Sequence, residues 1–279
     1  MSKNGFQNII YEKEGRRATI TINRPDKMNA CDSRTVSELY AAFLEAWADA
    51  GIGVVVLTGA GNKAFCAGGD QGTRGPGGYA SSEIADPVAR LPLEESWQFV
   101  TFLIRHIPKL VIARVNGFAI GGGHVWQVNC DLSVAAESAT LGQAGPRVGS
   151  FDPGFGTGEL SRTIGIKLAK EMWYLAGKYS AKQALQIGLV NFVVPDNELD
   201  SETDRICSEI LSKSPTALKM LKYSFLADSE GLSGITELGV GGLSLYYGTK
   251  ESMEGRNAMM EKRKPEFWRY YERRDDEGQ

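Results

Sequence analysis

Hydrophobic residues follow two different periods along the first half of the chain. Short apolar runs predict strands, at 18–23, 53–59, 110–117 and 131–138, and the β-branched run at 53–59 is typical of a strand buried on both faces. Residues 33–50 and 93–107 instead carry apolar side chains at helical spacing, with Ser33 as the predicted N-cap of the first helix. This alternation predicts right-handed βαβ units and a mostly parallel sheet, which is an α/β fold.

Two segments depart from this pattern. Residues 71–92 are rich in Gly, Pro and Ser, and a segment of that kind inside a compact domain is typical of a functional loop. From residue 201 onward the pattern becomes helical and amphipathic. We therefore predict a core over 1–200 and a helical C-terminal region over 201–279, whose apolar faces fit packing on a partner subunit or on the chain's own core equally well.

Composition and charge then narrow the classes of function. The 279 residues include 31 basic and 34 acidic side chains, and the net charge of −3 gives no reason to expect a nucleic-acid partner. No apolar run resembles a signal peptide or a membrane span, so we expect a cytoplasmic protein without a membrane partner. The four cysteines lack metal-binding spacing and the two histidines, His106 and His124, are far apart, so we expect free thiols and no metal ion.

Three glycine-rich segments are the candidates for chemistry. "FCAGGD" (65–70) and "AIGGGH" (119–124) each follow a strand-like run, and unobstructed backbone N–H groups at such turns suit a developing oxyanion. If both strands belong to one sheet, the two turns could each give one N–H to the same oxygen. The third segment, "GQAGPRVGSFDPGFG" (142–156), surrounds Asp152 and fits either a surface turn or an active-site loop.

Five segments along the chain are distinctive: "TINRPDKMNA", "VVLTGAGNKAFCAGGD", "VIARVNGFAIGGGH", "CDLSVAAESATLGQ" and "YSAKQALQIGLVNFVVP". In these segments and in their order, the chain resembles the crotonase (enoyl-CoA hydratase/isomerase) superfamily. The resemblance implies a spiral of ββα units and a helical C-terminal trimerisation region, in a homotrimer or a homohexamer. It also implies an acyl-CoA thioester substrate, with the thioester oxygen held by the N–H groups of Gly69 and Gly122.

The reaction depends on two positions at which the hydratases of this superfamily carry glutamates. Here they are Val125 and Gly145, which cannot move protons. Two branches of the superfamily share this glycine and the neighbouring "GSFD": 2-ketocyclohexanecarboxyl-CoA hydrolase and 1,4-dihydroxy-2-naphthoyl-CoA synthase. Met28, "FDPGFG" and "LSLYYGT" resemble the hydrolase more, whereas "TRGPGGY" and "VGSF" resemble the synthase.

The resemblance to the hydrolase implies roles for four side chains. Asp152 would orient or deprotonate the water that attacks a ring ketone, and Ser150 would hydrogen-bond the same carbonyl. Tyr79 and Tyr247, neutral at pH 7, would polarise the ketone or protonate an enolate. The alternatives are structural: an Asx-turn for Asp152, a core aromatic for Tyr247 and an exposed loop side chain for Tyr79.

Other positions match substrate or CoA contacts of the superfamily: Met28, Ala67, Gly68, Asp70, Gln71, Arg74, Phe118, Ala119, Ile120, Gly121, Gln143, Ala144, Gly145, Trp173 and Lys262. Gln143, Ala144 and Trp173 surround the place near Gly145 where the synthase branch binds bicarbonate as its base, so a bicarbonate or chloride ion is expected there and no other cofactor besides CoA. Arg74 would hold an acidic side chain or face solvent. Lys262 would meet CoA phosphates of a neighbouring chain, or only solvent.

The preferred prediction is therefore a hydrolase that opens a ring. It would cleave a C–C bond of a cyclic β-ketoacyl-CoA, such as 2-oxocyclohexane-1-carbonyl-CoA of anaerobic aromatic or alicyclic degradation, to a dicarboxylic acid mono-CoA ester. The alternative is the ring-closing naphthoyl-CoA synthase of menaquinone biosynthesis. A third possibility is a non-catalytic homologue that binds acyl-CoA.

Overall fold

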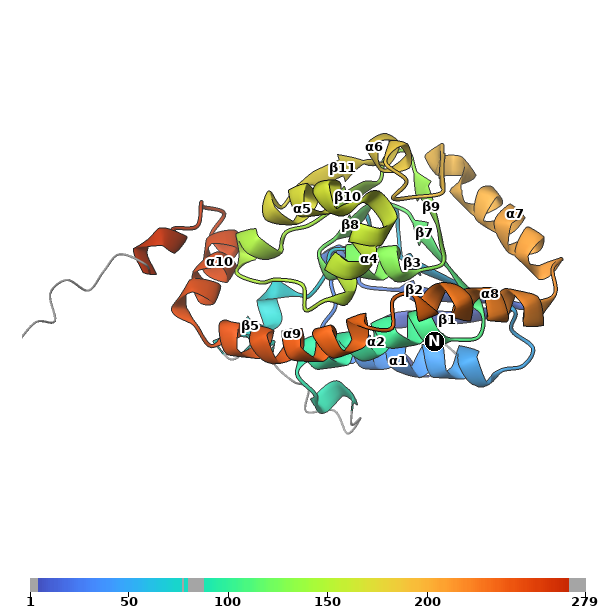
Figure 1. The fold of residues 1–279 in the computed structure, drawn as a ribbon, viewed down its shortest axis with the longest axis horizontal. Helices are drawn as coiled ribbons and strands as arrows, with labels where there is room; N and C mark the ends of the chain where they lie inside the picture. Colours follow the sequence, from blue (N-terminus) through green and yellow to red (C-terminus); the bar gives the residue numbers. More distant parts are fainter. Residues whose placement is uncertain (1–4, 77, 80–87, 271–279) are drawn as a thin grey trace, which may run out of the picture.

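Two sheets form the framework of the computed structural model, which describes residues 5–76, 78–79 and 88–270 (Figure 1). The main sheet has six strands in the order β1 (Ile9–Glu14), β2 (Arg17–Ile22), β3 (Val54–Gly59), β7 (Leu110–Val115), β9 (Leu132–Ala136) and β12 (Phe192–Val194). Only β1 and β2 pair antiparallel; the other neighbours are parallel. The four strands predicted from the apolar runs and the mostly parallel sheet are therefore confirmed. Part of the predicted loop, at 77 and 80–87, lies outside the described residues.

A smaller sheet stands at the carboxyl ends of the main strands. It contains β4 (Ala64–Cys66), β8 (Phe118–Ile120), β10 (Thr140–Gly142) and β11 (Lys178–Ser180), with β8 parallel to both β4 and β10. Each of β3, β7 and β9 is followed by one strand of this second sheet and then by a helix, namely α2 (Leu93–His106), α3 (Gly122–Asn129) and α4 (Phe155–Ile164). This repeat of two strands and a helix confirms the expected ββα spiral. A short hairpin of β5 (Arg74–Gly75) and β6 (Gly78–Tyr79) precedes α2.

The first helix, α1 (Ser33–Ala48), begins as predicted but with a different cap. Asp32, in extended conformation, accepts the backbone N–H of Thr35 at 2.9 Å, and Ser33 is the first helical residue. The prediction of Ser33 as N-cap is thus wrong by one residue. The sequence reads Asp-Ser at this point, and both residue types cap helices well, so the backbone conformation of Asp32 decides between them.

The predicted helical C-terminal region is present from its first residues onward. Further helices lie along the second half of the chain: α5 (Ile166–Tyr174), α6 (Ala181–Gln186), α7 (Leu199–Leu211), α8 (Pro215–Ala227), α9 (Leu232–Tyr247) and α10 (Lys250–Met260). In Figure 1, α7 lies at one end, α8 and α9 run along the lower side beside α1 and α2, and α10 lies at the other end. The division at residue 200 stays a prediction, since α7 begins at Leu199.

Alternate residues of β3 face two different cores. Val55 and Leu57 belong to the main core with α1 and α2, whereas Val54 and Val56 face Ile206 and other apolar side chains of α7. This two-sided burial explains the unbroken apolar run in the sequence. It also shows that α7 packs on its own chain.

All four cysteines are buried and free, and the sulfur atoms of Cys31 and Cys66 lie 3.8 Å apart. None of the helices within the described ranges is long and apolar enough to cross a membrane.

Candidate active site

A cavity of about 160 Å³ lies between the glycine turns, α2 and α9. It brings together all six predicted catalytic residues, Gly69, Gly122, Asp152, Ser150, Tyr79 and Tyr247. Of the predicted binding residues, it is lined by Ala67, Gly68, Gln71, Gly121, Gln143, Ala144, Gly145 and Trp173. Val125, at one of the two hydratase glutamate positions, also lines it. The catalytic and binding roles of these residues stay predictions, but they share one site.

The two glycine turns meet because β4 and β8 are parallel neighbours, so their carboxyl ends lie at the same edge. A Cβ added at Gly68 would lie 3.2 Å from Gly122 N. Gly122 is the first residue of α3, so its N–H cannot be satisfied within the helix and lies at the positive end of the helix dipole. The bridge between Cys31 and Gly69 uses Gly68 O and Asp70 N, which leaves Gly69 N–H outside that pairing. The structure thus brings the two turns together, and the binding of one oxygen by both N–H groups stays a prediction.

Tyr79 reaches the first glycine turn from the hairpin. A Cβ added at Gly69 would lie 2.6 Å from the Tyr79 hydroxyl oxygen, so this hydroxyl lies directly against the turn. The Tyr79 oxygen accepts a hydrogen bond from Gln71 Nε2 at 2.5 Å. Burial raises the pKa of Tyr79 well above its usual value, and the phenol stays protonated at neutral pH. Tyr79 is therefore not the exposed loop side chain of the alternative interpretation.

Ser150 and Tyr247 form a hydroxyl pair on the other side of the cavity. Ser150 Oγ lies 2.8 Å from the Tyr247 hydroxyl, which comes from the last turn of α9. The rings of Tyr247 and Tyr79 meet edge to face, with centroids 5.8 Å apart. Burial raises the pKa of Tyr247, so the site contains two neutral phenols that can donate a proton.

Asp152 carries out the structural role considered for it and lines the cavity as well. Its Oδ2 accepts the N–H groups of Thr157 at 2.6 Å and Gly154 at 3.1 Å, and its Oδ1 accepts that of Gly156 at 3.2 Å. These bonds cap the start of α4. Burial raises the pKa of Asp152, although the bonds from Thr157, Gly156 and Gly154 act in the opposite direction.

Arg74 differs from both of its expected roles. It is buried, and its guanidinium donates to the carbonyl oxygens of Val148 at 2.7 Å and Gly149 at 2.6 Å and to the hydroxyl of Ser252. It also lies over the Tyr247 ring, 4.3 Å from the centroid. Arg74 thus ties the glycine-rich segment to α10 through backbone carbonyls, where we expected an acidic side chain or solvent.

Seven predicted binding residues do not line the cavity: Met28, Asp70, Arg74, Phe118, Ala119, Ile120 and Lys262. Met28 O accepts the N–H of Ala67, and Asp70 accepts the N–H of Gly72, so both support the first glycine turn. Phe118 is exposed on β8, with the Lys178 ammonium 5.7 Å from its ring. Contacts of Phe118 and Lys262 with CoA remain predictions.

Four of the cavity residues that the sequence did not indicate come from α2: Leu93, Glu94, Trp97 and Gln98. The Trp97 ring lies against the second glycine turn, since a Cβ at Gly122 would lie 2.3 Å from Trp97 Cζ2. It stacks on Trp126 with centroids 3.8 Å apart. The helical pattern over 93–107 predicted α2, but an amphipathic pattern does not tell which turn of a helix faces a cavity.

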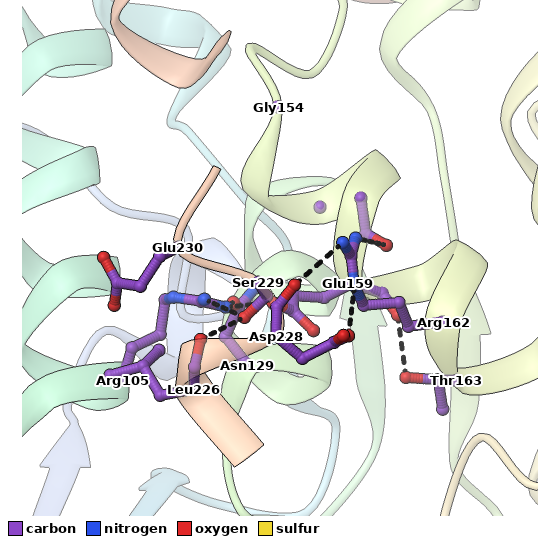
Figure 2. Close-up of polar contacts among 12 residues, drawn as sticks. Arg105, Asn129, Gly154, Glu159, Arg162, Thr163, Leu226, Asp228, Ser229 and Glu230 are labelled. Carbon is purple, nitrogen blue, oxygen red and sulfur yellow. Dashed lines mark hydrogen bonds and ion pairs between the residues drawn. The ribbon is translucent and has the colours of Figure 1, made fainter. Parts of the chain in front are cut away.

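A polar cluster holds these helices together away from the cavity (Figure 2). Arg105, near the end of α2, donates to Asn129 Oδ1 of α3 at 2.9 Å and to Ser229 Oγ at 2.7 Å, and it forms an ion pair with Glu159 of α4. We call these four residues the Arg105 cluster. It fixes α2, α3 and α4 relative to one another, and these helices carry Trp97, Gly122 and the turn capped by Asp152.

Comparison with known proteins agrees with this geometry. Residues 12–269 match the enoyl-CoA hydratase/isomerase family, and the chain belongs to this family, within the crotonase superfamily. The fold is similar to an enoyl-CoA hydratase from Mycobacterium avium subsp. paratuberculosis K-10, at 25% identity and a TM-score of 0.82, over 94% of this chain and 98% of that chain.

Two further similar structures have different activities. A carnitinyl-CoA hydratase from Mycobacterium avium shares 30% identity at a TM-score of 0.78, over 93% of this chain and 98% of that chain. A methylmalonyl-CoA decarboxylase in complex with 2-nitronate-propionyl-CoA shares 27% identity at a TM-score of 0.78, over 94% of this chain and 99% of that chain. The chain is thus an acyl-CoA-processing enzyme of the crotonase superfamily, and the side chains in the cavity have to define the reaction.

Proposed function

We propose that the protein hydrolyses a C–C bond of a cyclic β-ketoacyl-CoA and opens the ring. One observation carries this proposal: Asp152, Ser150 and Tyr247 line the cavity that contains the glycine pair, while Val125 and Gly145 stand at the two hydratase glutamate positions. A water-activating carboxylate and hydroxyl donors are therefore available, but the hydratase pair of carboxylates is absent at its two positions. A ring ketone beside the thioester needs this set of groups.

The first step adds water to the ring ketone. Asp152 takes a proton from the water, and the Ser150–Tyr247 pair donates a hydrogen bond to the ketone oxygen as it gains charge. The cap of α4 does not prevent this role of Asp152. A carboxylate offers about four acceptor sites, and the three backbone N–H groups leave capacity on Oδ1.

The second step breaks the bond between the former ketone carbon and the α-carbon. The electron pair moves to the α-carbon and the thioester oxygen, and the resulting enolate is stabilised by the N–H groups of Gly69 and Gly122. The former ketone carbon becomes a carboxyl group. Tyr79, whose hydroxyl lies against Gly69, then donates a proton to the α-carbon. The proton that Asp152 took from the water is released and restores the phenol of Tyr79, so the enzyme returns to its starting state. One water is consumed, and the product is a dicarboxylic acid mono-CoA ester.

The ring-closing synthase is the second candidate, because one observation favours it. Trp173 Nε1 lines the cavity with Gln143 and Gly145, and within the described part of the chain this buried N–H has no hydrogen-bond partner. Trp173 Nε1 is suited to donate to bicarbonate or chloride, and the unpartnered Gln143 Oε1 could accept the hydroxyl of bicarbonate. Bound there, bicarbonate would supply the base that the chain lacks at Gly145. Room at Gly145 itself is limited, since an added Cβ would lie 3.0 Å from Ser150 O.

Mass spectrometry of the products separates the candidates. We expect 2-oxocyclohexane-1-carbonyl-CoA to gain the mass of one water, and o-succinylbenzoyl-CoA to remain unchanged with and without bicarbonate. Loss of one water from o-succinylbenzoyl-CoA would replace the hydrolase with the synthase. Binding of both esters without turnover would support a non-catalytic acyl-CoA-binding protein.

A substitution at Asp152 tests the mechanism. Asp152→Asn should lower kcat roughly 10²–10⁴-fold, because general-base help has about this size. It should also cost about 1 kcal/mol of stability, because one carboxylate oxygen of the α4 cap is replaced. Loss of stability with a kcat near that of the wild type would leave Asp152 with its capping role alone.

We also infer that the protein forms homotrimers or homohexamers and that it works in the cytoplasm. Exposed apolar side chains on the C-terminal helices, such as Phe225, Leu238 and Leu245, support the association of copies. Light scattering after size-exclusion chromatography measures the assembly directly, and a monomer at micromolar concentration would contradict this inference.

A further inference from the structure

The first turn of α2 brings a carboxylate to the cavity that the proposed reaction does not use. Glu94 is only 6% exposed and lines the cavity. Its Oε1 accepts the Ser244 hydroxyl at 3.3 Å, whereas Oε2 is buried and has no hydrogen-bond partner among the described residues. Burial of a carboxylate without a full set of partners is costly, so its position needs an explanation.

Two other side chains of α2 also bring an unpaired polar atom to the side of the cavity that α2 forms. Trp97 Nε1 and Gln98 Oε1, one turn further along α2, are also buried, line the same cavity and have no hydrogen-bond partner in the described ranges. A buried donor or acceptor that stays unpaired keeps the full cost of its desolvation. Three of them on one wall of a cavity indicate that a ligand provides the missing hydrogen bonds.

The position of Glu94, Trp97 and Gln98 indicates which part of the ligand they would bind. A Cβ added at Gly78 would lie 3.1 Å from Glu94 Oε1 and 3.0 Å from Tyr247 Cδ2, so both side chains flank the same glycine. Trp97 lies against Gly122, which provides one of the two oxyanion N–H groups. A group that reaches Glu94 is therefore close to the thioester carbonyl. It belongs to the acyl part of the substrate.

The charges around Glu94 favour an uncharged group. Burial raises the pKa of Glu94, and the neighbouring Glu95 acts in the same direction, while Arg74 acts against it. Of the described residues, Tyr79 and Tyr247 also lie near Glu94, and both phenols are neutral. The Arg74 guanidinium is already bonded to Val148 O, Gly149 O and Ser252. Both terminal nitrogens of Arg74 are thus in use, only its Nε lacks a partner among the described residues, and a ligand carboxylate beside Glu94 would meet a like charge.

We propose that Glu94 is a specificity-determining residue that accepts a hydrogen bond from an uncharged hydroxyl group of the acyl part and rejects acyl groups with a free carboxylate at that place. This inference rests on the proposed function, which it deepens. The adduct that forms when water adds to the ring ketone carries such a hydroxyl group. Ring opening turns the ketone carbon into a carboxylate, so the same residue would favour release of the product.

Two matched esters test this proposal without any turnover. 2-Hydroxycyclohexane-1-carbonyl-CoA and 2-carboxycyclohexane-1-carbonyl-CoA share ring and thioester and differ in the charge of one substituent, and neither has a ketone to cleave. Isothermal titration gives the ratio of their Kd values. We expect the wild-type protein to bind the hydroxy ester at least about tenfold more tightly, and Glu94→Gln to reduce this ratio about tenfold by tightening the carboxy ester.

Two further variants control the experiment. Glu95→Gln removes a carboxylate from the adjacent position, which does not line the cavity, and it should leave the ratio unchanged. Glu94→Asp keeps the charge and should keep the discrimination, and its melting temperature, with that of Glu94→Gln, reports on folding. An unchanged ratio in Glu94→Gln, or an equal shift in Glu95→Gln, would overturn the role of Glu94. Because no ester is cleaved, this result is independent of the ring-opening assay.

Discussion

The two ends of α2 bury polar side chains in opposite ways. At its C-terminal end, both terminal nitrogens of Arg105 donate to partners on α3, on α4 and in the turn after α8 (Figure 2). At its N-terminal end, Glu94, Trp97 and Gln98 each bury a polar atom for which the described residues provide no partner. One end borders a cavity that contains the glycine pair, and the other end fixes the helices that surround it.

This difference separates structural from functional burial of polar groups. The Arg105 guanidinium has its charge paired with Glu159 and partners at both terminal nitrogens, so that only its Nε lacks one, and it lies 4.8 Å from the centroid of the Phe155 ring. A buried donor or acceptor that faces a cavity is incomplete until something binds. Burial alone would rank Arg105 and Glu94 together, but their partners distinguish them.

Removal of Glu159 should have the largest effect on stability. The side chains of Arg105 and Glu159 are 5% and 17% exposed, and Glu159→Ala leaves a buried cation without its carboxylate. We expect a loss of about 3–5 kcal/mol in the free energy of unfolding. Denaturant titration measures it, and a loss below about 1 kcal/mol would contradict the structural role of the Arg105 cluster.

The largest effect on activity is expected at Gly122. Gly122→Pro removes one of the two N–H groups, and loss of such a donor costs roughly 10²–10³-fold in kcat. Proline suits the first helical position, but its Cβ would meet Trp97. Gly122→Ala brings the same Cβ and keeps the N–H, so the kcat ratio of the two variants isolates the donor. Equal rates would exclude Gly122 from the oxyanion site.

Much of this arrangement could be predicted from the sequence, because it depends on local periodicity. The apolar runs gave the parallel strands, and two strands in one sheet imply that the turns at Gly69 and Gly122 lie at the same edge. The cap of α1 was missed by one residue because Asp32 and Ser33 have the same local preference. Family resemblance, rather than spacing, indicated Tyr247.

The rest depends on contacts between distant segments. Arg74 donates hydrogen bonds to the backbone carbonyls of Val148 and Gly149. Every residue has a backbone carbonyl, so the sequence of side chains does not predict such a partner. Glu94 lies in a helix that the pattern predicted, yet its importance comes from β6 and α9, which close the cavity around it. A sequence pattern shows which face of a helix is buried, but not whether that face meets a core or a ligand.

His124 is buried next to a residue that lines the cavity, and it makes the free energy of unfolding depend on pH. Its Nδ1 lies 2.7 Å from Gln143 Nε2, and burial lowers its pKa to about 3. The unfolded chain takes up this proton near pH 6.5 and the folded chain does not, so stability is lost as pH falls below 6.5. Between pH 6.5 and 4.5 the loss should be about 2 kcal/mol.

His124→Asn keeps an acceptor near the Nδ1 position and removes the titrating group. Denaturant titrations at both pH values should therefore give a smaller difference for this variant than for the wild type. The comparison uses the change in the free energy of unfolding between the two pH values, so a loss of stability that is the same at both pH values cancels. An equal change in the wild type and in the variant would show that His124 is not responsible for the acid sensitivity.

The smallest effect is expected from the second ion pair in Figure 2, between Arg162 and Asp228. Arg162 lies on the same helix as Glu159, and Asp228 follows α8. Arg162 Nε is 3.3 Å from Asp228 Oδ2, but the two side chains are 42% and 82% exposed. Water already solvates both charges, so the pair gains little when it forms, and Arg162→Ala should change the free energy of unfolding by less than about 1 kcal/mol. Denaturant titration beside Glu159→Ala measures both pairs on one scale. If the exposed pair cost as much as the buried one, neither the burial of the ion pair nor the bonds to both terminal nitrogens of Arg105 would explain the stability of the Arg105 cluster, and the contrast with Glu94 would lose its physical basis.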